Sequence, residues 1–381
     1  MPETTFAEVV NADEAVLTHI TPTVPADTGE ITLGKRMLSL IQSGYPIAER
    51  PYEVLGKELG ISEDEALACV RNLYDQGYIK RIGAVFDSAA LGYVSTLAAM
   101  AVENPEDVER CAAIASAYPE VTHNYERSNR YNLWFTVIAR DRVRLVRILD
   151  EIREKTGCAD LLDLPADKLY KIRVDFRLDG KAAPDVSQWS SEYTPDRDSS
   201  KSDYFSAPDE GVAPLTEEDR AFVRALQDDL AVCPRPFDVV AAALSEEGVV
   251  TTAAEIVVRA RSWADTGLIR RFGAVVKHRK LGFSANAMTV WDVPDAETDA
   301  AGAIMAADPR VSHCYRRPRY PSWPQNLYAM IHGRTEADCN ACEADISAAL
   351  EERGINASAP MHLYSTREFK KCSMRYFVEE D

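Results

Sequence analysis

The chain has 381 residues, which is too long for one compact core and suits two or more domains. Its formal charge of −18 disfavours a protein that binds DNA by neutralising phosphates. No apolar run approaches the roughly 20 residues that span a bilayer. The first 30 residues carry acids where a secretory signal needs a basic stretch, and the eight cysteines follow no regular framework. We therefore expect a cytoplasmic protein with free thiols and no membrane segment.

The first half begins with a segment, residues 1–30, that we expect to be flexible. A helical domain is predicted over 31–87. It consists of an apolar helix face at 37–41, a short helix at 52–60 and a third helix capped by Ser62, with acids in its first turn. The apolar residues of 78–85 predict a wing-like hairpin after the third helix. This outline is that of a winged helix-turn-helix domain.

The second part of the first half, residues 88–178, alternates strand and helix patterns. The predicted elements are a strand at 93–102, a helix at 105–118, a strand pair at 121–127 and 131–139, a helix at 142–156 and a final strand at 168–176. The order βαββαβ predicts a ferredoxin-like module.

The chain then repeats this plan, after a linker at 179–214 that is rich in Asp, Ser and Pro. Three pairs of segments match: Ile79–Val85 with Ile269–Val275, Val121–Arg127 with Val311–Arg317, and Leu169-Tyr170 with Leu363-Tyr364. The second copy predicts a winged helix-turn-helix domain at 215–277 and a ferredoxin-like module at 278–381. The sequence therefore predicts an α+β fold built by tandem duplication.

One motif occurs at the same place in both copies. In the first, His123, Tyr125 and Arg127 occupy alternate positions of a predicted strand, and a second set, His313, Tyr315 and Arg317, repeats the spacing. Alternate residues of a strand project from one face. A single His and Tyr on a strand are more often packing groups than catalysts, but the repetition favours a functional role.

These motifs carry a family resemblance. The winged helix-turn-helix followed by βαββαβ resembles the Lrp/AsnC regulators, including the transition at 77–85. The segments 123–127 and 313–318 are similar to the His-x-Tyr-x-Arg signature of siroheme decarboxylases, and 271–283 and 324–333 also resemble that family. The resemblance covers nearly everything except the linker and the tail.

The resemblance implies an activity. In siroheme decarboxylases two related polypeptides pair, and some members carry both in one chain. They remove CO2 from two acetate side chains of siroheme and give didecarboxysiroheme, on the way to heme or heme d1, with siroheme as substrate and no organic cofactor. We therefore expect the two halves to pair with each other. The sequence leaves open whether two chains associate.

The resemblance also implies roles for residues. A siroheme pocket needs apolar walls, cations for the carboxylates and a proton donor. His123, His313, Tyr125 and Tyr315 are the expected catalytic residues, and either histidine is alternatively a ligand of the siroheme iron. The expected substrate-binding residues are Arg81, Arg127, Arg130, Arg173, Arg271, Arg316, Arg317, Arg319, Arg367 and Trp323. For the arginines the alternative is pairing with Asp or Glu, and for Trp323 packing against the sheet.

Other readings remain. The chain could be an Lrp/AsnC-type transcription regulator, although acids at the start of the predicted recognition helix, Ser62–Glu65, would meet phosphates. It could also bind heme or siroheme without catalysis. Cys339 and Cys342 have metal-site spacing but no second pair, and His332 and His362 are expected to be structural.

Overall fold

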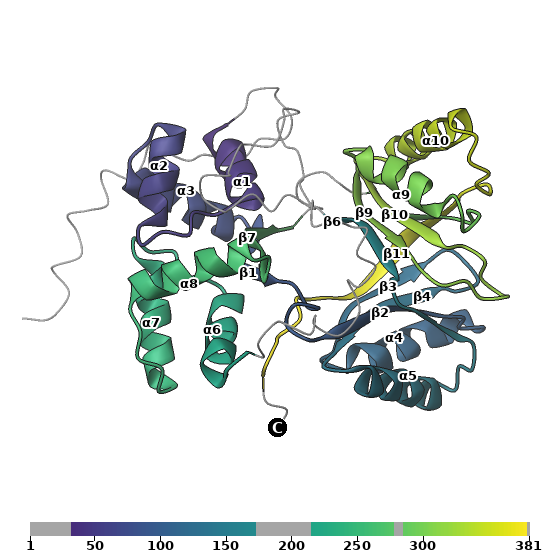
Figure 1. Cartoon of the computed structure of the whole chain (residues 1–381), viewed down its shortest axis with the longest axis horizontal. Helices are drawn as coiled ribbons and strands as arrows, with labels where there is room; N and C mark the ends of the chain where they lie inside the picture. The colour runs from purple at the N-terminus through teal and green to yellow at the C-terminus, as the bar shows by residue number, and fades with distance from the viewer. Residues whose placement is uncertain (1–31, 173–214, 278–284, 379–381) are drawn as a thin grey trace, which may run out of the picture.

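The computed structural model describes residues 32–172, 215–277 and 285–378. These form a helical lobe and a lobe built on a large sheet (Figure 1). The predicted N-terminal segment 1–30 and linker 179–214 lie outside the described residues. No helix among the residues described is long and apolar enough to cross a membrane.

The helical lobe combines three helices from each half. They are α1 (Leu33–Ser43), α2 (Pro51–Leu59), α3 (Glu63–Asp75), α6 (Glu217–Gln227), α7 (Pro236–Glu246) and α8 (Ala253–Asp265). Ser62 caps α3 through a capping box with Glu65, as predicted, and Thr252 does the same for α8 with Glu255. One apolar core contains residues of both halves, so the two helical domains are a single packed unit.

The predicted wing hairpin is wrong. Residues 79–86 form one continuous strand, β1 (Ile79–Phe86), which pairs antiparallel with β7 (Ile269–Val276) of the other half. Gly83, opposite Gly273 in this pairing, is a point of close approach and makes no turn. A Cβ on Gly83 would lie 2.5 Å from the Asp228 carbonyl oxygen, and one on Gly273 would lie 2.8 Å from that of Ile41. Glycine is needed there because the end of a helix presses on each strand.

The sheet lobe contains both predicted ferredoxin-like modules. The first has β2 (Val94–Met100), η1 (Pro105–Asp107), α4 (Val108–Ser116), β3 (Val121–Arg127), β4 (Leu133–Ala139), α5 (Arg142–Thr156) and β5 (Leu161–Leu164). The second has β8 (Ala285–Trp291), α9 (Thr298–Ala307), β9 (Val311–Arg316), β10 (Leu327–Gly333), α10 (Glu336–Glu352) and β11 (Met361–Lys371). The order βαββαβ is confirmed in each half.

The last strands are exchanged between the halves, which the sequence did not predict. β5 closes the first module against β2, whereas β6 (Lys168–Ile172), expected as the final strand of that module, pairs with β9 of the second. β11 pairs with β8 through residues 361–364 and with β3 through residues 365–371. The match of Leu169-Tyr170 with Leu363-Tyr364 is therefore wrong. Residues 162–164 are the structural equivalent of 361–363, because both segments pair with the corresponding strand of their own module.

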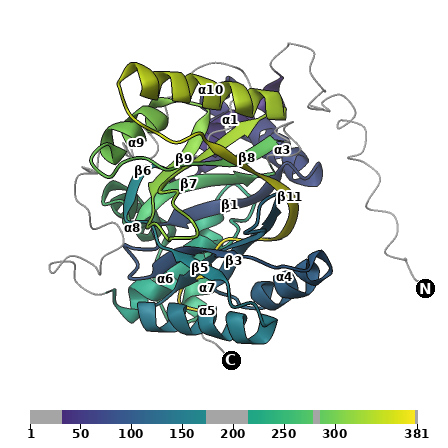
Figure 2. The ribbon, with the colours of Figure 1, turned by 90° about the vertical axis from the view of Figure 1, so that its right-hand side faces the viewer.

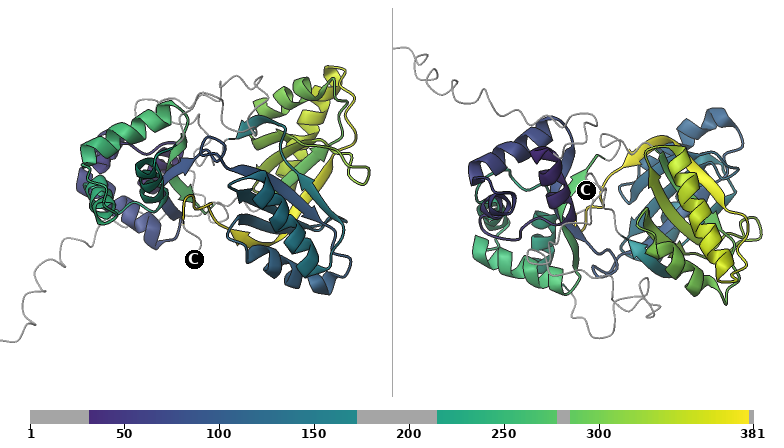
Figure 3. Two further views of the ribbon diagram at one scale, coloured as in Figure 1. Left: turned by 60° about the horizontal axis from the view of Figure 1, so that its bottom comes forward. Right: turned by 90° about the horizontal axis from the view of Figure 1, so that it is seen from above.

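The sheet lobe is a sandwich with helices outside. α4 and α5 cover one outer face and α9 and α10 the other, with the strands between them (Figure 2). The inner faces share an apolar layer to which both halves contribute, including Trp134, Leu164, Met288 and Tyr328. Beyond β11 the chain runs back to the helical lobe (Figure 3), where Tyr376 is buried in the core.

Candidate active site

The two His-x-Tyr-x-Arg motifs lie on inner strand faces. On β3, the intervening Asn124 is buried against α4, where its Nδ2 donates to the Ala112 carbonyl and the Ser116 hydroxyl, each at 3.0 Å. His123, Tyr125 and Arg127 alternate with Asn124 and therefore point away from the helices. On β9, Cys314 is buried in the core under α9 and α10 in the same way. The predicted sharing of one face is confirmed in both halves.

The histidines have matching surroundings. The ring centroid of His123 lies 6.2 Å from that of Tyr125, and the centroid of His313 lies 6.2 Å from that of Tyr315. Nδ1 of each histidine is hydrogen-bonded to the hydroxyl of the preceding residue, Thr122 at 3.0 Å or Ser312 at 2.8 Å. Within the described part of the chain, neither Nε2 has a hydrogen-bond partner, so Nε2 is the ring nitrogen available to a ligand.

Burial keeps both imidazoles neutral. It lowers the pKa of His123 to about 4, with smaller contributions from the charges of Lys371 and Lys80. It lowers the pKa of His313 to about 3, with contributions that include His332, Arg270 and His123. Lys371 contributes to both shifts, and His123 contributes to that of His313, so the two histidines lie near some of the same charged groups.

The arginines of the two motifs reach across between the halves. Nη1 of Arg127 donates to the Leu363 carbonyl, and Nη1 of Arg317 donates to the Leu164 carbonyl, each at 2.5 Å. Neither guanidinium contacts a carboxylate among the described residues, and Nε of each is buried without a protein partner. Burial lowers the pKa of Arg127 to about 10. Two buried cations without acidic partners fit a ligand that carries carboxylates.

Most other predicted binding residues are engaged elsewhere. Arg130 pairs with Asp160, Arg316 with Asp167, Arg319 with Asp292 and Asp295, and Arg367 with Glu126. The indole nitrogen of Trp323 donates to the Tyr328 hydroxyl at 2.7 Å, and its ring packs against Tyr131 and Trp134 in the layer between the sheets. For these residues the structure shows pairing or packing. Arg173 lies outside the described residues.

Arg81 and Arg271 point away from the histidines. Nη1 of Arg81 donates to the Gln227 carbonyl at the end of α6, and Nη1 of Arg271 donates to the Gln42 carbonyl near the end of α1. The cations that lower the pKa values of the histidines include Lys371 and the residues that precede Arg81 and Arg271 in sequence, Lys80 and Arg270. Adjacent basic residues in both copies were a signal for this position. Which of the two faces the sheet lobe depends on the side of the strand that the helices occupy.

Arg270 and Lys80 are held at the junction of the lobes. Nη2 of Arg270 lies 3.0 Å from Oδ2 of Asp87, a buried carboxylate just after β1. Nζ of Lys80 donates to the Lys371 carbonyl at the end of β11, at 2.8 Å. Strands β1 and β7 thus each place one basic side chain, Lys80 or Arg270, near the histidines.

No group of three His, Cys, Asp or Glu in the described chain is arranged to hold a metal.

Comparisons with known proteins show which family this chain belongs to. Residues 34–80 match a family described as the siroheme decarboxylase NirDL-like HTH domain, and residues 90–171 and 280–370 match the AsnC-like ligand binding domain. A siroheme decarboxylase of Hydrogenobacter thermophilus is 33% identical over 91% of this chain and 95% of its own length. The chain belongs to the siroheme decarboxylase family.

Two further relatives of this siroheme decarboxylase family member are informative. The siroheme decarboxylase alpha subunit of Nitratidesulfovibrio vulgaris is 51% identical over 38% of this chain and 81% of its own length. The crystal structure of the siroheme decarboxylase NirDL in complex with an iron-uroporphyrin III analogue matches with a TM-score of 0.63 and 29% identity, over 90% of this chain and 94% of that chain. A subunit that matches less than half of the chain agrees with the duplication.

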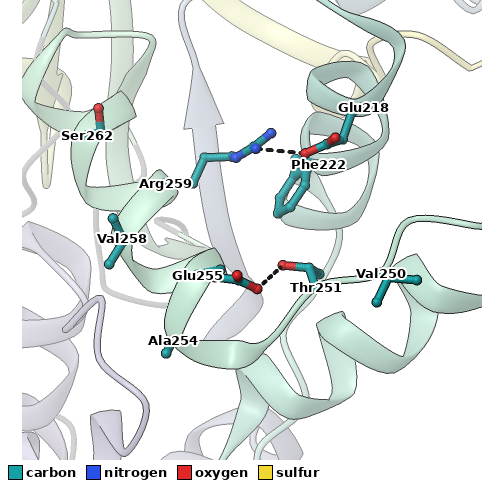
Figure 4. Close-up of a pocket in the computed structure, with 9 residues that line it drawn as sticks. All are labelled: Glu218, Phe222, Val250, Thr251, Ala254, Glu255, Val258, Arg259 and Ser262. Carbon is teal, nitrogen blue, oxygen red and sulfur yellow. Dashed lines mark hydrogen bonds and ion pairs between the residues drawn. The ribbon is translucent and has the colours of Figure 1, made fainter.

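The helical lobe of this family member also has a surface depression. A depression beside α8 is lined by Phe222, Val250 and Val258 (Figure 4). Its base, Arg259, is paired with Glu218 at 2.7 Å and with Asp219 at 3.0 Å. The lining contains none of the predicted site residues, so this depression is separate from the histidine site.

The buried histidines predict a stability that declines in acid. Their pKa values are lower in the folded chain than the 6.5 of free histidine, so the unfolded state binds more protons below pH 6.5. The free energy of unfolding therefore decreases as the pH is lowered below about 6.5, by up to about 1.4 kcal/mol per pH unit for each histidine. Urea unfolding at pH 7 and pH 5.5 should show a loss about 2 kcal/mol larger in the unaltered protein than in a His123→Asn, His313→Asn variant. Equal losses would contradict the prediction.

Proposed function

We propose that this chain is a carboxy-lyase that removes CO2 from two acetate side chains of siroheme and yields didecarboxysiroheme. The observation that carries the proposal is the site shared by the two His-x-Tyr-x-Arg motifs. It combines two neutral imidazoles with two guanidinium groups, one buried and one half-buried, that have no acidic partner among the residues the structure describes. Such a site offers both proton donors and cations that bind carboxylates, in a protein whose acidic residues greatly outnumber its basic ones.

The reaction needs one proton for each CO2. When the bond between the methylene carbon and the carboxylate breaks, the electron pair passes into the macrocycle, and the methylene carbon then takes up a proton to become a methyl group. Nε2 of His123 or His313 is the proposed donor because Nδ1 is already bonded to a hydroxyl, and the neutral ring regains this proton from water before the next turnover. Coordination of the siroheme iron is the alternative use of the same Nε2 atoms. Loss of a nitrogen ligand from the electron paramagnetic resonance spectrum in the alanine variants would favour that alternative.

Lys80 and Arg270 are the proposed further partners of the siroheme carboxylates, with the Arg270 guanidinium shared between the substrate and Asp87. Arg270→Ala should raise the dissociation constant for siroheme about tenfold, because a charge-assisted hydrogen bond contributes roughly 1.5–3 kcal/mol. Arg271→Ala is the matched control, since its guanidinium bonds to backbone carbonyls on the helical side. Absorbance titration measures both constants. Equal effects of the two substitutions would contradict the assignment.

Anaerobic incubation with siroheme tests the proposed function directly. Mass analysis of the extracted tetrapyrrole should show the loss of two CO2. Unchanged siroheme with a shifted absorption spectrum would instead indicate a binding protein. Tight, salt-sensitive binding to specific DNA fragments in a gel-shift series would favour the transcription regulator.

A further inference from the structure

Two described segments run between the lobes and are bonded to each other. One is 87–93, between β1 and β2, and the other is 372–378, which follows β11. The hydroxyl of Tyr376 lies 2.6 Å from that of Ser88. The rings of Tyr93 and Tyr376 meet edge to face, with their centroids 5.0 Å apart. The two segments therefore form one joint between the lobes.

The 372–378 segment is held tightly in the helical lobe. Tyr376 is 6% exposed, and its backbone N–H and carbonyl both bond to the side-chain amide of Gln227 at the end of α6, at 2.8 and 3.1 Å. Among the non-glycine residues that the structure describes, only Phe377 has a positive φ, of 55°. Such a conformation persists where the surroundings impose it. Here the backbone N–H of Phe377 donates to the Tyr93 hydroxyl at 3.1 Å.

The other end of this segment lies beside His123. The backbone N–H of Cys372 donates to the Thr122 carbonyl at 2.9 Å, and the Thr122 hydroxyl is bonded to Nδ1 of His123 at 3.0 Å. The preceding Lys371 pairs with His123 across β11 and β3, and its carbonyl accepts from Nζ of Lys80 at 2.8 Å. The segment that ends in the helical lobe therefore starts at a histidine of the proposed site.

The anchor at Ser88 lies next to a cation of the same site. The neighbouring Asp87 is buried, and its Oδ2 lies 3.0 Å from Nη2 of Arg270. Oδ1 of Asp87 accepts two backbone N–H groups of the turn that follows, so the turn orients the carboxylate and the carboxylate orients the guanidinium. Burial raises the pKa of Tyr376 to about 12, and the charges of Arg270 and Asp87 also contribute. The phenol is therefore protonated and close to this ion pair.

We propose that Tyr376 is a positioning residue for Arg270. By bonding to Ser88, it fixes the turn that orients the Arg270 guanidinium, and through the 372–378 segment it relates that guanidinium to His123. The inference rests on the proposed function, in which Arg270 binds a carboxylate of siroheme. The histidines belong to the sheet lobe and Arg270 to the helical lobe, so a macrocycle contacts both only if the lobes are correctly placed. A misplacement of about 1 Å is enough to weaken such contacts.

Substitutions at the anchor test this role through siroheme binding, measured by rapid-mixing absorbance before turnover. Tyr376→Phe keeps the buried ring and removes only the hydroxyl, so it should raise the dissociation constant for siroheme about fivefold. Ser88→Ala removes the same hydrogen bond and should have the same effect. The double variant Tyr376→Phe, Arg270→Ala should bind no more weakly than Arg270→Ala alone, because the hydroxyl acts through that guanidinium. Additive losses would overturn the proposal, and so would unchanged binding in both single variants.

Two control variants separate positioning from stability. Leu244→Ala alters the same apolar core on α7, on the side of the helical lobe away from the sheet lobe (Figure 1). It should lower the urea midpoint more than Tyr376→Phe does and leave siroheme binding unchanged. Tyr364→Phe removes a hydroxyl on β11 that bonds to Asn340 on α10, and it should change neither quantity.

Weaker binding in Leu244→Ala, as large as in Tyr376→Phe, would show that loss of stability explains the effect and would overturn the proposal. If the unaltered protein binds siroheme but releases no CO2, the proposed function fails, while the comparison of dissociation constants still decides whether Tyr376 positions Arg270.

Discussion

Alanine at His313 is expected to lower kcat for CO2 loss from siroheme about 100- to 1000-fold, the usual contribution of a positioned general acid. The imidazole is held by Ser312 and lies beside Tyr315, so its Nε2 is oriented before the substrate arrives. Because cations are the proposed main contacts of the substrate carboxylates, the dissociation constant for siroheme should change much less than kcat.

Anaerobic stopped assays with mass detection would measure this effect, and His123→Ala belongs in the same series. If each histidine serves one acetate, either variant should accumulate a product that has lost a single CO2. His362→Ala, in the same half but on the helix side, should react like the unaltered protein. Normal turnover in both alanine variants would exclude the histidines from the chemistry.

Methionine at Arg317 is expected to weaken both the fold and the binding of siroheme. The substitution removes the hydrogen bond to the Leu164 carbonyl, which joins the second half to the first. A buried carbonyl without its donor costs about 1–3 kcal/mol, so the free energy of unfolding should fall by about 2 kcal/mol. Arg317 has no carboxylate partner in the described part of the chain, so loss of its positive charge should raise the dissociation constant for siroheme about tenfold or more.

The adjacent Arg316 provides the control for this prediction. Its guanidinium lies on the opposite strand face and pairs with Asp167 at 3.3 Å near the surface. Exposed pairs of this kind contribute at most about 1 kcal/mol, so Arg316→Met should leave siroheme binding and unfolding nearly unchanged. Unchanged siroheme affinity in Arg317→Met would show that the buried guanidinium groups serve the fold alone.

Local patterns predicted the elements and the duplication, but not which strands would meet. Alternation alone placed His123, Tyr125 and Arg127 on one face, and this required no knowledge of the partner strand. The hairpin expected around Gly83 required that knowledge. A glycine between two apolar runs is as compatible with a turn as with a close helix contact. Likewise, the residues of β6 have strand character, but nothing local shows that they pair with the other half.

The arginine predictions were limited by a related problem. In a chain with 61 acidic residues, a basic residue near a motif has many potential partners, and Arg130, Arg316 and Arg319 found them. Composition indicates that such pairing is common, but only the fold shows which guanidinium groups have no acid beside them. The neighbours Lys80 and Arg81 lie on opposite faces of one strand. Which face turns toward the histidines depends on helices that are far away in sequence.

The exchange of β6 and β11 has a consequence for how the molecule holds together. Each half contributes backbone hydrogen bonds to the sheet of the other. The side chains of Arg127 and Arg317 each add a hydrogen bond to a backbone carbonyl of the opposite half. Cohesion between the halves therefore does not depend on their being joined covalently. An ancestor made as two separate polypeptides could assemble through the same contacts, and fusing them would mainly guarantee equal amounts of each.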